Sequence, residues 1–304
     1  MDYHAQFRRA AIEQGIPEDA VSRFADHLRF AIWTSTRGSG EVVGQLGGLP
    51  RLPVGAGWPS AAADEDEPLP FIASFDCAAL PSVAGLALPA DGSLLFFLEH
   101  EYACECDSID DEQPYARVVY VPAGTDTAAV ADLPPGHDSW ALCFEGPFLR
   151  PAHELFASVR PALPRWLEEP DSEDDLRFES DVVRQVVSEL THVGELRALV
   201  GRLWPATSQY ADLYLGGYSM ELGRGDNPES HLAAASIRAS QPDLPSSERY
   251  RAEQEETQRL MREWLPLAQF GTRDEVYYGR FLIRNDDLAA GRFDQALSFT
   301  MFTE

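Results

Sequence analysis

The chain has 304 residues, a formal net charge of −26 and 44% hydrophobic residues. This hydrophobic share supports a sizeable core, and the length suggests one large domain or two. All 24 basic residues are arginine. The sequence therefore excludes sites that need a lysine, such as a P-loop, a Schiff base or a pyridoxal phosphate centre. The negative charge also argues against an extended nucleic-acid surface, which needs cations against phosphate.

No segment is typical of a membrane or secreted protein. The first residues lack the apolar region of a signal peptide, and no apolar run approaches the roughly 18 residues of a membrane span. Four cysteines in so long a chain do not make a disulfide framework. We therefore expect a soluble, cytoplasmic protein without membrane contact.

The first predicted element is a helix over residues 17–33. Pro17 suits the first helical turn, and Glu18 and Asp19 suit the positive end of the helix dipole. Apolar side chains then recur at helical spacing as far as Ile32. A short strand is expected next, over residues 41–46.

Residues 47–59 are predicted to form a stiff, extended arm. A glycine pair allows a sharp turn at its start, and three prolines exclude a helix interior or a central strand. One interpretation is a structural strap that buries Trp58 against the body. A second makes the arm the rim of a ligand cleft, with Arg51 and Trp58 as ligand contacts. A third takes the PxxP match at residues 50–53 as a ligand for another protein.

Apolar or alternating runs bounded by turn residues predict the later strands. Residues 99–112 carry seven acids and no arginine, which predicts a surface loop. Two stretches with apolar residues at helical spacing predict helices over residues 183–203 and 246–264. The predicted strands cover residues 70–75, 93–98, 117–121, 140–144, 276–283 and 296–302.

A stretch rich in proline and acid, residues 161–181, is the best candidate for a linker. It divides the chain into a first half, residues 1–160, and a second half, residues 161–304, expected to form one compact unit. Short motifs recur in the same order in both halves, which predicts an internal repeat in which a Gly-Gly turn precedes two strands. The matching motifs are Leu46-Gly47-Gly48 with Leu215-Gly216-Gly217, Ile72-Ala73-Ser74-Phe75 with Leu267-Ala268-Gln269-Phe270, and residues 94–98 with residues 278–283.

These motifs also carry a family likeness. The sequence resembles the YwqG-like family of bacterial domains of unknown function over roughly residues 41–304. The resemblance implies an α+β fold with mixed or mainly antiparallel sheets and flanking helices, and it implies no known activity. The family's Trp-Gly-Asp motif is replaced here by Thr272-Arg273-Asp274-Glu275. The matching segments are Gly47-Gly48-Leu49-Pro50, Trp58-Pro59, residues 68–73, residues 92–97, Tyr214-Leu215-Gly216-Gly217-Tyr218, the strand that contains Gln269, and Phe293-Asp294.

One group of residues could hold a metal. His100, Cys104 and Cys106 lie close together in sequence, and Cys77 or Cys143 could join them. Imidazole and thiolate ligands suit zinc. The spacing is not the Cys-x₂-Cys of common zinc sites, so a surface loop with incidental cysteines is the alternative. No other cofactor is expected.

The familiar catalytic motifs are missing from the sequence, including the serine nucleophile elbow, the His-Glu-x-x-His zinc motif and the dinucleotide fingerprint. We therefore expect a non-catalytic cytoplasmic binding or interaction protein. One version is an acidic protein that neutralises a basic protein partner, as an immunity protein does. The alternative is a hydrolase-type enzyme with its site in a cleft between the halves, near Trp58 and Gln269.

Overall fold

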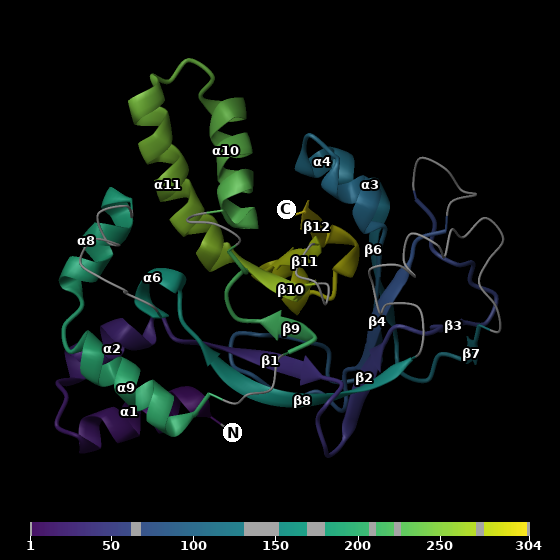
Figure 1. Cartoon of the computed structure of the whole chain (residues 1–304), viewed down its shortest axis with the longest axis horizontal. Coiled ribbons are helices and arrows are strands. Elements are labelled where there is room, and N and C mark those ends of the chain that lie inside the picture. Colours follow the sequence, from purple (N-terminus) through teal and green to yellow (C-terminus); the bar gives the residue numbers. More distant parts are fainter. Residues whose placement is uncertain are drawn as a thin grey trace.

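Helices and antiparallel strands together build an α+β fold (Figure 1). The computed structural model describes residues 2–61, 68–130, 152–168, 180–206, 211–221, 226–271 and 277–302. The strands are β1 Arg29–Ser35, β2 Val42–Leu46, β3 Arg51–Pro53, β4 Phe71–Asp76, β5 Ser93–Leu98, β6 Ala116–Val121, β7 Thr127–Ala129, β8 His153–Ala162, β9 Leu213–Gly216, β10 Trp264–Gly271, β11 Tyr277–Arg284 and β12 Leu297–Phe302. The helices are α1 Tyr3–Glu13, α2 Glu18–Ala25, α3 His100–Cys104, α4 Ile109–Glu112, η1 Gln113–Tyr115, α6 Arg165–Glu168, α8 Asp181–Glu189, α9 Val193–Leu203, α10 Pro228–Ser240, α11 Ser246–Glu263, α12 Asn285–Ala289 and η2 Phe293–Gln295. In the described ranges, no helix has both the length and the apolar character needed to cross a membrane.

A ten-stranded sheet forms the body, in the order β12-β11-β10-β9-β1-β8-β2-β4-β5-β6, and β3 and β7 form a separate small sheet. The order is symmetric about the central pair β1–β8. On one side, β8 is followed by β2, β4, β5 and β6; on the other, β1 is followed by β9, β10, β11 and β12. The first strand of the first half, β1, therefore lies between β8 and β9 of the second half. The first strand of the second half, β8, lies between β1 and β2 of the first half. The predicted α+β fold with mainly antiparallel sheets is confirmed.

The two outer sets of strands also share their register. In both sets the second strand has a bulge directly before an alanine. The strand is β4 with Ala73 in one set and β10 with Ala268 in the other. The predicted repeat is thus confirmed in strand order and in register. The equivalent positions are Gln45 and Tyr214, Ser74 and Gln269, Ala73 and Ala268, Leu95 and Arg280, and Phe96 and Phe281.

The main core lies where the two sets of strands face one another. The equivalent side chains Phe96 and Phe281 meet there, with ring centroids 5.2 Å apart in an edge-to-face arrangement. Both are almost fully buried. Aromatic burial of this kind is among the largest apolar gains in a fold. A smaller apolar cluster lies under the arm and includes Leu52, Leu95 and Phe97.

The predicted helix over residues 17–33 is wrong in its second part. Helix α2 ends at Ala25, and residues 29–35 form the central strand β1. Phe30, Ala31 and Ile32 are all buried because β1 has neighbours on both sides and lies in the middle of the sheet. A continuous apolar run of this length fits a strand buried on both faces as well as it fits a helix, so spacing alone could not separate them.

Residues 99–112 are not the expected loop. Helices α3 and α4 occupy much of this stretch, and Ser108 caps α4 by accepting a hydrogen bond from the Asp111 amide at 3.2 Å. The stretch packs on β12, where the Gln113 side chain donates to the Ser298 carbonyl and accepts from the Ser298 amide. The helical periodicity turns Glu112 inward, so one acid of the run is buried.

The sequence analysis also missed the helices α1 and α10 and the strands β8 and β9, and other predicted elements differ at their ends. The helix predicted over residues 183–203 is two helices, α8 and α9, separated near His192, which has a left-handed φ of 57°. The predicted strand at residues 140–144 lies outside the described residues, as do residues 169–179 of the expected linker. The expected division after residue 160 falls inside β8, the strand that opens the second half of the sheet.

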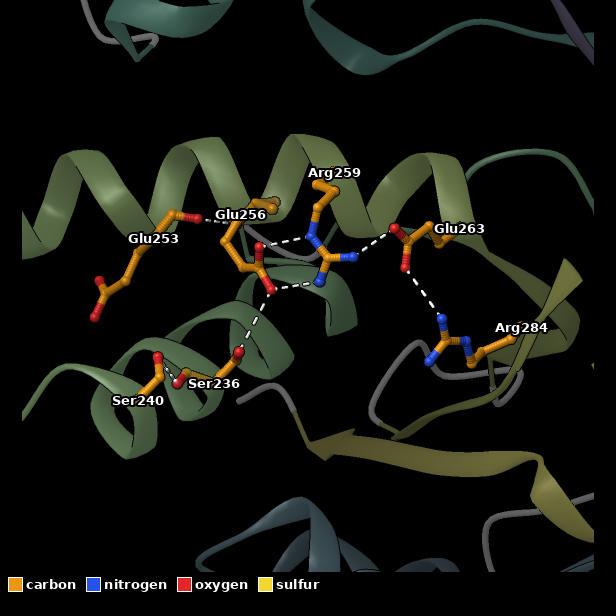
Figure 2. Close-up of polar contacts among 8 residues, drawn as sticks. Ser236, Ser240, Glu253, Glu256, Arg259, Glu263 and Arg284 are labelled. Atoms are coloured by element: carbon orange, nitrogen blue, oxygen red, sulfur yellow. Dashed lines mark hydrogen bonds and ion pairs between the residues drawn. The ribbon is translucent and has the colours of Figure 1, made fainter. Parts of the chain in front are cut away.

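Helices α10 and α11 form a hairpin that stands beside the sheet (Figure 1). Arg259 bonds both carboxylate oxygens of Glu256 and one of Glu263, and Glu263 also pairs with Arg284 of β11 at 3.3 Å (Figure 2). Ser236 of α10 donates to Glu256 at 3.4 Å. Exposed ion pairs contribute little stability singly. This network instead fixes the position of α11 relative to α10 and the sheet.

The first Gly-Gly turn, at residues 47–48, allows the close packing between this turn and the chain before β8 to be tested. Gly48 has a φ of +73°, and a Cβ placed there would lie 2.5 Å from the Ala152 Cβ. Gly55 has a similar φ of +84° but open space around it. We expect Gly55→Ala to lower the free energy of unfolding by about 1 kcal/mol through backbone strain alone. Gly48→Ala should cost roughly 1–3 kcal/mol more, because the neighbouring strand must also shift. Urea unfolding of both variants measures the difference, and equal losses would contradict the close approach.

Candidate functional site

Two cavities in the described part of the chain share Arg29 as a lining residue. The smaller has a volume of about 270 Å³ and lies against the turn after β9. The larger, about 430 Å³, is called here the Arg29 pocket. It is lined by Arg23, Asp26, His27, Arg29, Pro164, Trp166, Val186, Glu189, Leu190, Tyr218, Gln258, Met261 and Arg262.

Arg29 begins β1, at the end of the central strand pair, where Ala162 of β8 lies opposite it. Its guanidinium donates to the Gly217 carbonyl at 3.1 Å and to the Met261 carbonyl. The guanidinium carbon lies 4.2 Å from the centre of the Tyr218 ring. Within the described residues Arg29 forms no ion pair with a carboxylate. Carbonyl groups and a ring face carry only partial charges, so the positive charge of Arg29 is not neutralised.

Gln269 shapes the pocket without lining it. Its amide nitrogen donates to the Tyr218 carbonyl at 2.9 Å, and its amide oxygen accepts from the Met220 backbone at 2.8 Å. Tyr218 in turn donates its hydroxyl to the His27 carbonyl at 3.0 Å. The buried Gln269 side chain therefore holds the turn that presents the Tyr218 ring beneath Arg29. Sequence reasoning placed Gln269 at a ligand site, and the structure gives both of its amide groups backbone partners.

The opposite wall combines aromatic and basic side chains. The rings of His27 and Trp166 meet edge to face, with centroids 5.1 Å apart. Burial lowers the pKa of His27, so this ring is neutral at neutral pH. Helix α8 closes the pocket with Glu189, whose carboxylate lies 3.8 Å from the guanidinium of Arg23, with both groups exposed.

The charge of the Arg29 pocket differs in sign from that of the whole chain. Arginines 23, 29 and 262 give three positive charges, and Asp26 and Glu189 give two negative ones. Three minus two leaves an excess of one positive charge while His27 is neutral. In a protein with a net charge of −26, the pocket is a local cationic site with two aromatic walls.

The two predicted site residues of the arm do not reach this pocket. Arg51 is exposed on β3, and its guanidinium donates to the Thr127 carbonyl of β7 at 2.8 Å. Trp58 is half-buried, and its indole donates to the Leu69 carbonyl at 2.7 Å. The Trp58 ring packs edge to face on Phe97. The arm thus lies against the smaller apolar cluster in the manner of a strap.

The predicted metal ligands are not brought together in a metal-binding geometry. His100 is 3% exposed, whereas Cys104 and Cys106 are half-buried. In the residues that the structure describes, no group of three or more His, Cys, Asp or Glu side chains is placed to hold a metal ion. Burial and neighbouring acids raise the pKa of Cys106, which disfavours the thiolate that zinc requires. Cys143 lies outside the described residues.

Fold and pocket together define an α+β protein of two related halves, with a cationic pocket at the end of their central strand pair. The sequence pattern of the DUF1963 family, a domain of unknown function, matches residues 44–300. The chain belongs to this family. No curated protein matches the sequence. Arg23, His27 and Arg29 precede the matched region, whereas Tyr218 and Gln269 lie within it, so the pocket combines the family domain with the segment before it.

Sequence reasoning missed the Arg29 pocket because its parts are far apart in the chain. The bonds from Arg29 to the Gly217 and Met261 carbonyls span 188 and 232 residues. The prediction also put Arg29 near the end of a helix and gave it no role. The one available signal was the Gly-Gly echo at residues 216–217, which marked this turn as the counterpart of the first.

The burial of His100 has a consequence that can be measured. Burial lowers its pKa from 6.5 to about 4. The unfolded chain therefore takes up a proton below pH 6.5 that the folded protein does not. The stabilising effect is fully present above pH 6.5 and is lost as the pH falls towards 4. We expect wild type to lose roughly 3 kcal/mol more than His100→Leu between pH 7 and pH 4. Urea unfolding at each pH measures this, with the exposed His192→Leu as control. Parallel profiles for wild type and His100→Leu would contradict the burial.

Proposed function

We propose that this protein is a non-catalytic binding protein whose ligand is a small anion carrying a planar apolar group. The ligand occupies the Arg29 pocket. One observation carries the proposal: the guanidinium of Arg29 lines a cavity of about 430 Å³ without a carboxylate partner among the described residues. The volume falls within the range of about 300–1,000 Å³ typical of small-molecule sites.

The composition of the walls favours the two parts of this ligand. An anionic group gains from Arg29 and from the arginines at positions 23 and 262. A planar apolar group gains from stacking on the ring of Trp166 or Tyr218. Because the Gln269 bonds hold the turn that carries Tyr218, much of the site is ordered before the ligand arrives, which reduces the entropic cost of binding.

Binding is favoured over hydrolysis by the residues that are present. Among the described residues that line the Arg29 pocket there is no serine, threonine or cysteine to act as a nucleophile. His27 is the one histidine of this lining, and it packs against Trp166. The hydrolase alternative placed its site near both Trp58 and Gln269. Trp58 contacts Phe97 under the arm, whereas Gln269 contacts the turn after β9.

The broader predictions are carried forward as proposals. We place the protein in the cytoplasm, and we regard the DUF1963 match as consistent with the resemblance to the YwqG-like family. A basic protein partner is supported by the net charge of −26 alone. Of the two acidic stretches described above, residues 99–112 are largely helical, and residues 169–179 of the second lie outside the described residues.

The proposal is tested with phenyl phosphate, which joins an anionic group to an aromatic ring. Titration should change the tryptophan fluorescence in a saturable way and raise the melting temperature. Arg29→Gln should weaken binding by roughly tenfold or more, because a charge-assisted hydrogen bond contributes about 1.5–3 kcal/mol. Binding should also weaken with added salt, as expected for an anion at a cationic site.

Arg117→Gln is the matched control. Arg117 is also a part-buried arginine bound to backbone carbonyls, those of Gln113 and Ala116, but it lies on the edge strand β6. It should leave the affinity unchanged. Trp166→Phe should remove most of the fluorescence change while retaining much of the binding measured by calorimetry. Equal affinity in wild type and Arg29→Gln would refute the proposed site.

A further inference from the structure

A second arginine, Arg280, is buried without hydrogen-bond partners among the described residues. Arg280, in the middle of β11, is fully buried, with 0% of its surface exposed. All three guanidinium nitrogens lack a hydrogen-bond partner in the described part of the chain. The guanidinium carbon lies 5.3 Å from the centre of the Phe299 ring. Burial lowers the pKa of Arg280 to about 10, so the group is still charged at neutral pH. A buried charge without hydrogen bonds is strongly destabilising unless another molecule supplies them.

Two buried carboxyl groups, those of Glu229 and Glu112, act electrostatically on Arg280. Glu229, in the first turn of α10, accepts from the Ser219 hydroxyl at 2.7 Å through one oxygen, and its other oxygen lacks a partner among the described residues. Glu112, at the end of α4, accepts from the Thr300 hydroxyl at 2.9 Å. Figure 1 shows α10 and α4 above β11, to the left and right of the C-terminal end of β12. The fold therefore gathers ionisable groups from both halves around one guanidinium.

The internal repeat shows that the fold does not need a charge at this position. The equivalent residue of the first half is Leu95, because Leu95 pairs with Ser74 as Arg280 pairs with Gln269. Leu95 is 2% exposed and belongs to the smaller apolar cluster under the arm. An apolar side chain thus occupies the equivalent position in the first half of the sheet. A buried charge without hydrogen bonds lowers stability, and the first half shows that an apolar side chain can occupy this position, so packing alone does not explain Arg280.

We propose that Arg280 anchors a second binding site, which takes the carboxylate of a small monocarboxylic acid between α10 and α4. The guanidinium offers a planar fork of N–H donors that matches the two oxygens of a carboxylate. Glu229 adds a carboxyl oxygen that has no partner in the described residues. When protonated, this carboxyl donates a further hydrogen bond to the ligand.

The surrounding charges select one negative charge in the ligand. Burial raises the pKa of Glu112 to about 7 and also raises the pKa of Glu229, so both carboxyls take up a proton at a higher pH than they would in water. Asp226 lies 2.7 Å from the imidazole of His231, beside α10, and Tyr278 is the other titratable group that acts on Arg280. With both glutamates protonated, the positive charge of Arg280 favours a monoanion, and the nearby carboxylate of Asp226 adds repulsion against a dianion. A phosphate dianion would meet too much negative charge.

Binding at this site is therefore linked to proton uptake. A carboxylate next to ionised Glu112 and Glu229 would be repelled, so the neutral forms bind better. We expect the affinity for acetate to be greatest below pH 7 and to fall by up to about tenfold per pH unit above it. Isothermal titration calorimetry with acetate at several pH values, in buffers of different ionisation enthalpy, measures both the affinity and the protons taken up.

The decisive variant is Arg280→Leu, which copies the residue of the first half. We expect it to fold and to match or exceed the stability of wild type in urea without ligand. It should also lose the rise in melting temperature that acetate gives to wild type at pH 6. Sodium chloride at equal ionic strength controls for salt, and inorganic phosphate tests the dianion. Arg284→Leu is the matched control, since Arg284 lies on the same strand but is exposed and paired with Glu263.

The outcomes separate this proposal from its rivals. If Arg280→Leu fails to fold, or is much less stable than wild type, Arg280 is structural and the proposal is wrong. If acetate raises the melting temperature no more than chloride does, ordered water satisfies the guanidinium and the proposal is also wrong. A stronger response to phosphate would replace the monocarboxylate with a different anion. The variant Arg29→Gln should keep the acetate response, so the two sites can fail independently.

Discussion

The pairing of β1 with β8 is the interaction on which the rest of the structure depends. It runs without interruption from Arg29 opposite Ala162 to Ser35 opposite Phe156. Because β1 also pairs with β9 and β8 also pairs with β2, each half of the sheet is completed by a strand from the other half. Neither half can close its hydrogen-bond ladder alone, and an open ladder leaves buried backbone groups without partners. The same pairing places Arg29 at the strand end, where the turn after β9 and the end of α11 converge.

The two halves use the same frame for different purposes. At the first Gly-Gly turn, Gln45 of β2 donates to the carbonyls of Gly47 and Leu49. At the second turn, Gln269 does the corresponding work from the neighbouring strand, at the position equivalent to Ser74. A glutamine side chain therefore holds both turns, but it comes from the first strand of one set, β2, and from the second strand of the other set, β10. The first half covers its sheet with an apolar strap, whereas the second carries the α10–α11 hairpin and most of the buried polar groups.

Sequence alone predicted those parts of the fold that depend on local pattern. The run at residues 94–98 is apolar throughout and lies in β5, a strand buried on both faces, and α11 follows its amphipathic spacing closely. Local pattern could not identify β1, since its apolar run suits either a helix or a central strand. Nor could it show that His100 turns inward while Cys106 stays near the surface, because sequence spacing does not give side-chain direction. The burial of Arg280 was not predicted either, since an arginine in an alternating strand is ordinarily taken to face water.

The exchange of β1 and β8 has a consequence for the history of the chain. A single ancestral half would present a sheet with one strand missing, and a second copy would supply that strand reciprocally. Such a pair is a homodimer with a two-fold axis between its central strands. Fusion of the two copies would turn that axis into the pseudosymmetry seen in the strand order. Copies fused in this way would no longer have to be identical. A leucine in one could stay in the core while its counterpart became an arginine, which a symmetric dimer would have had to carry twice.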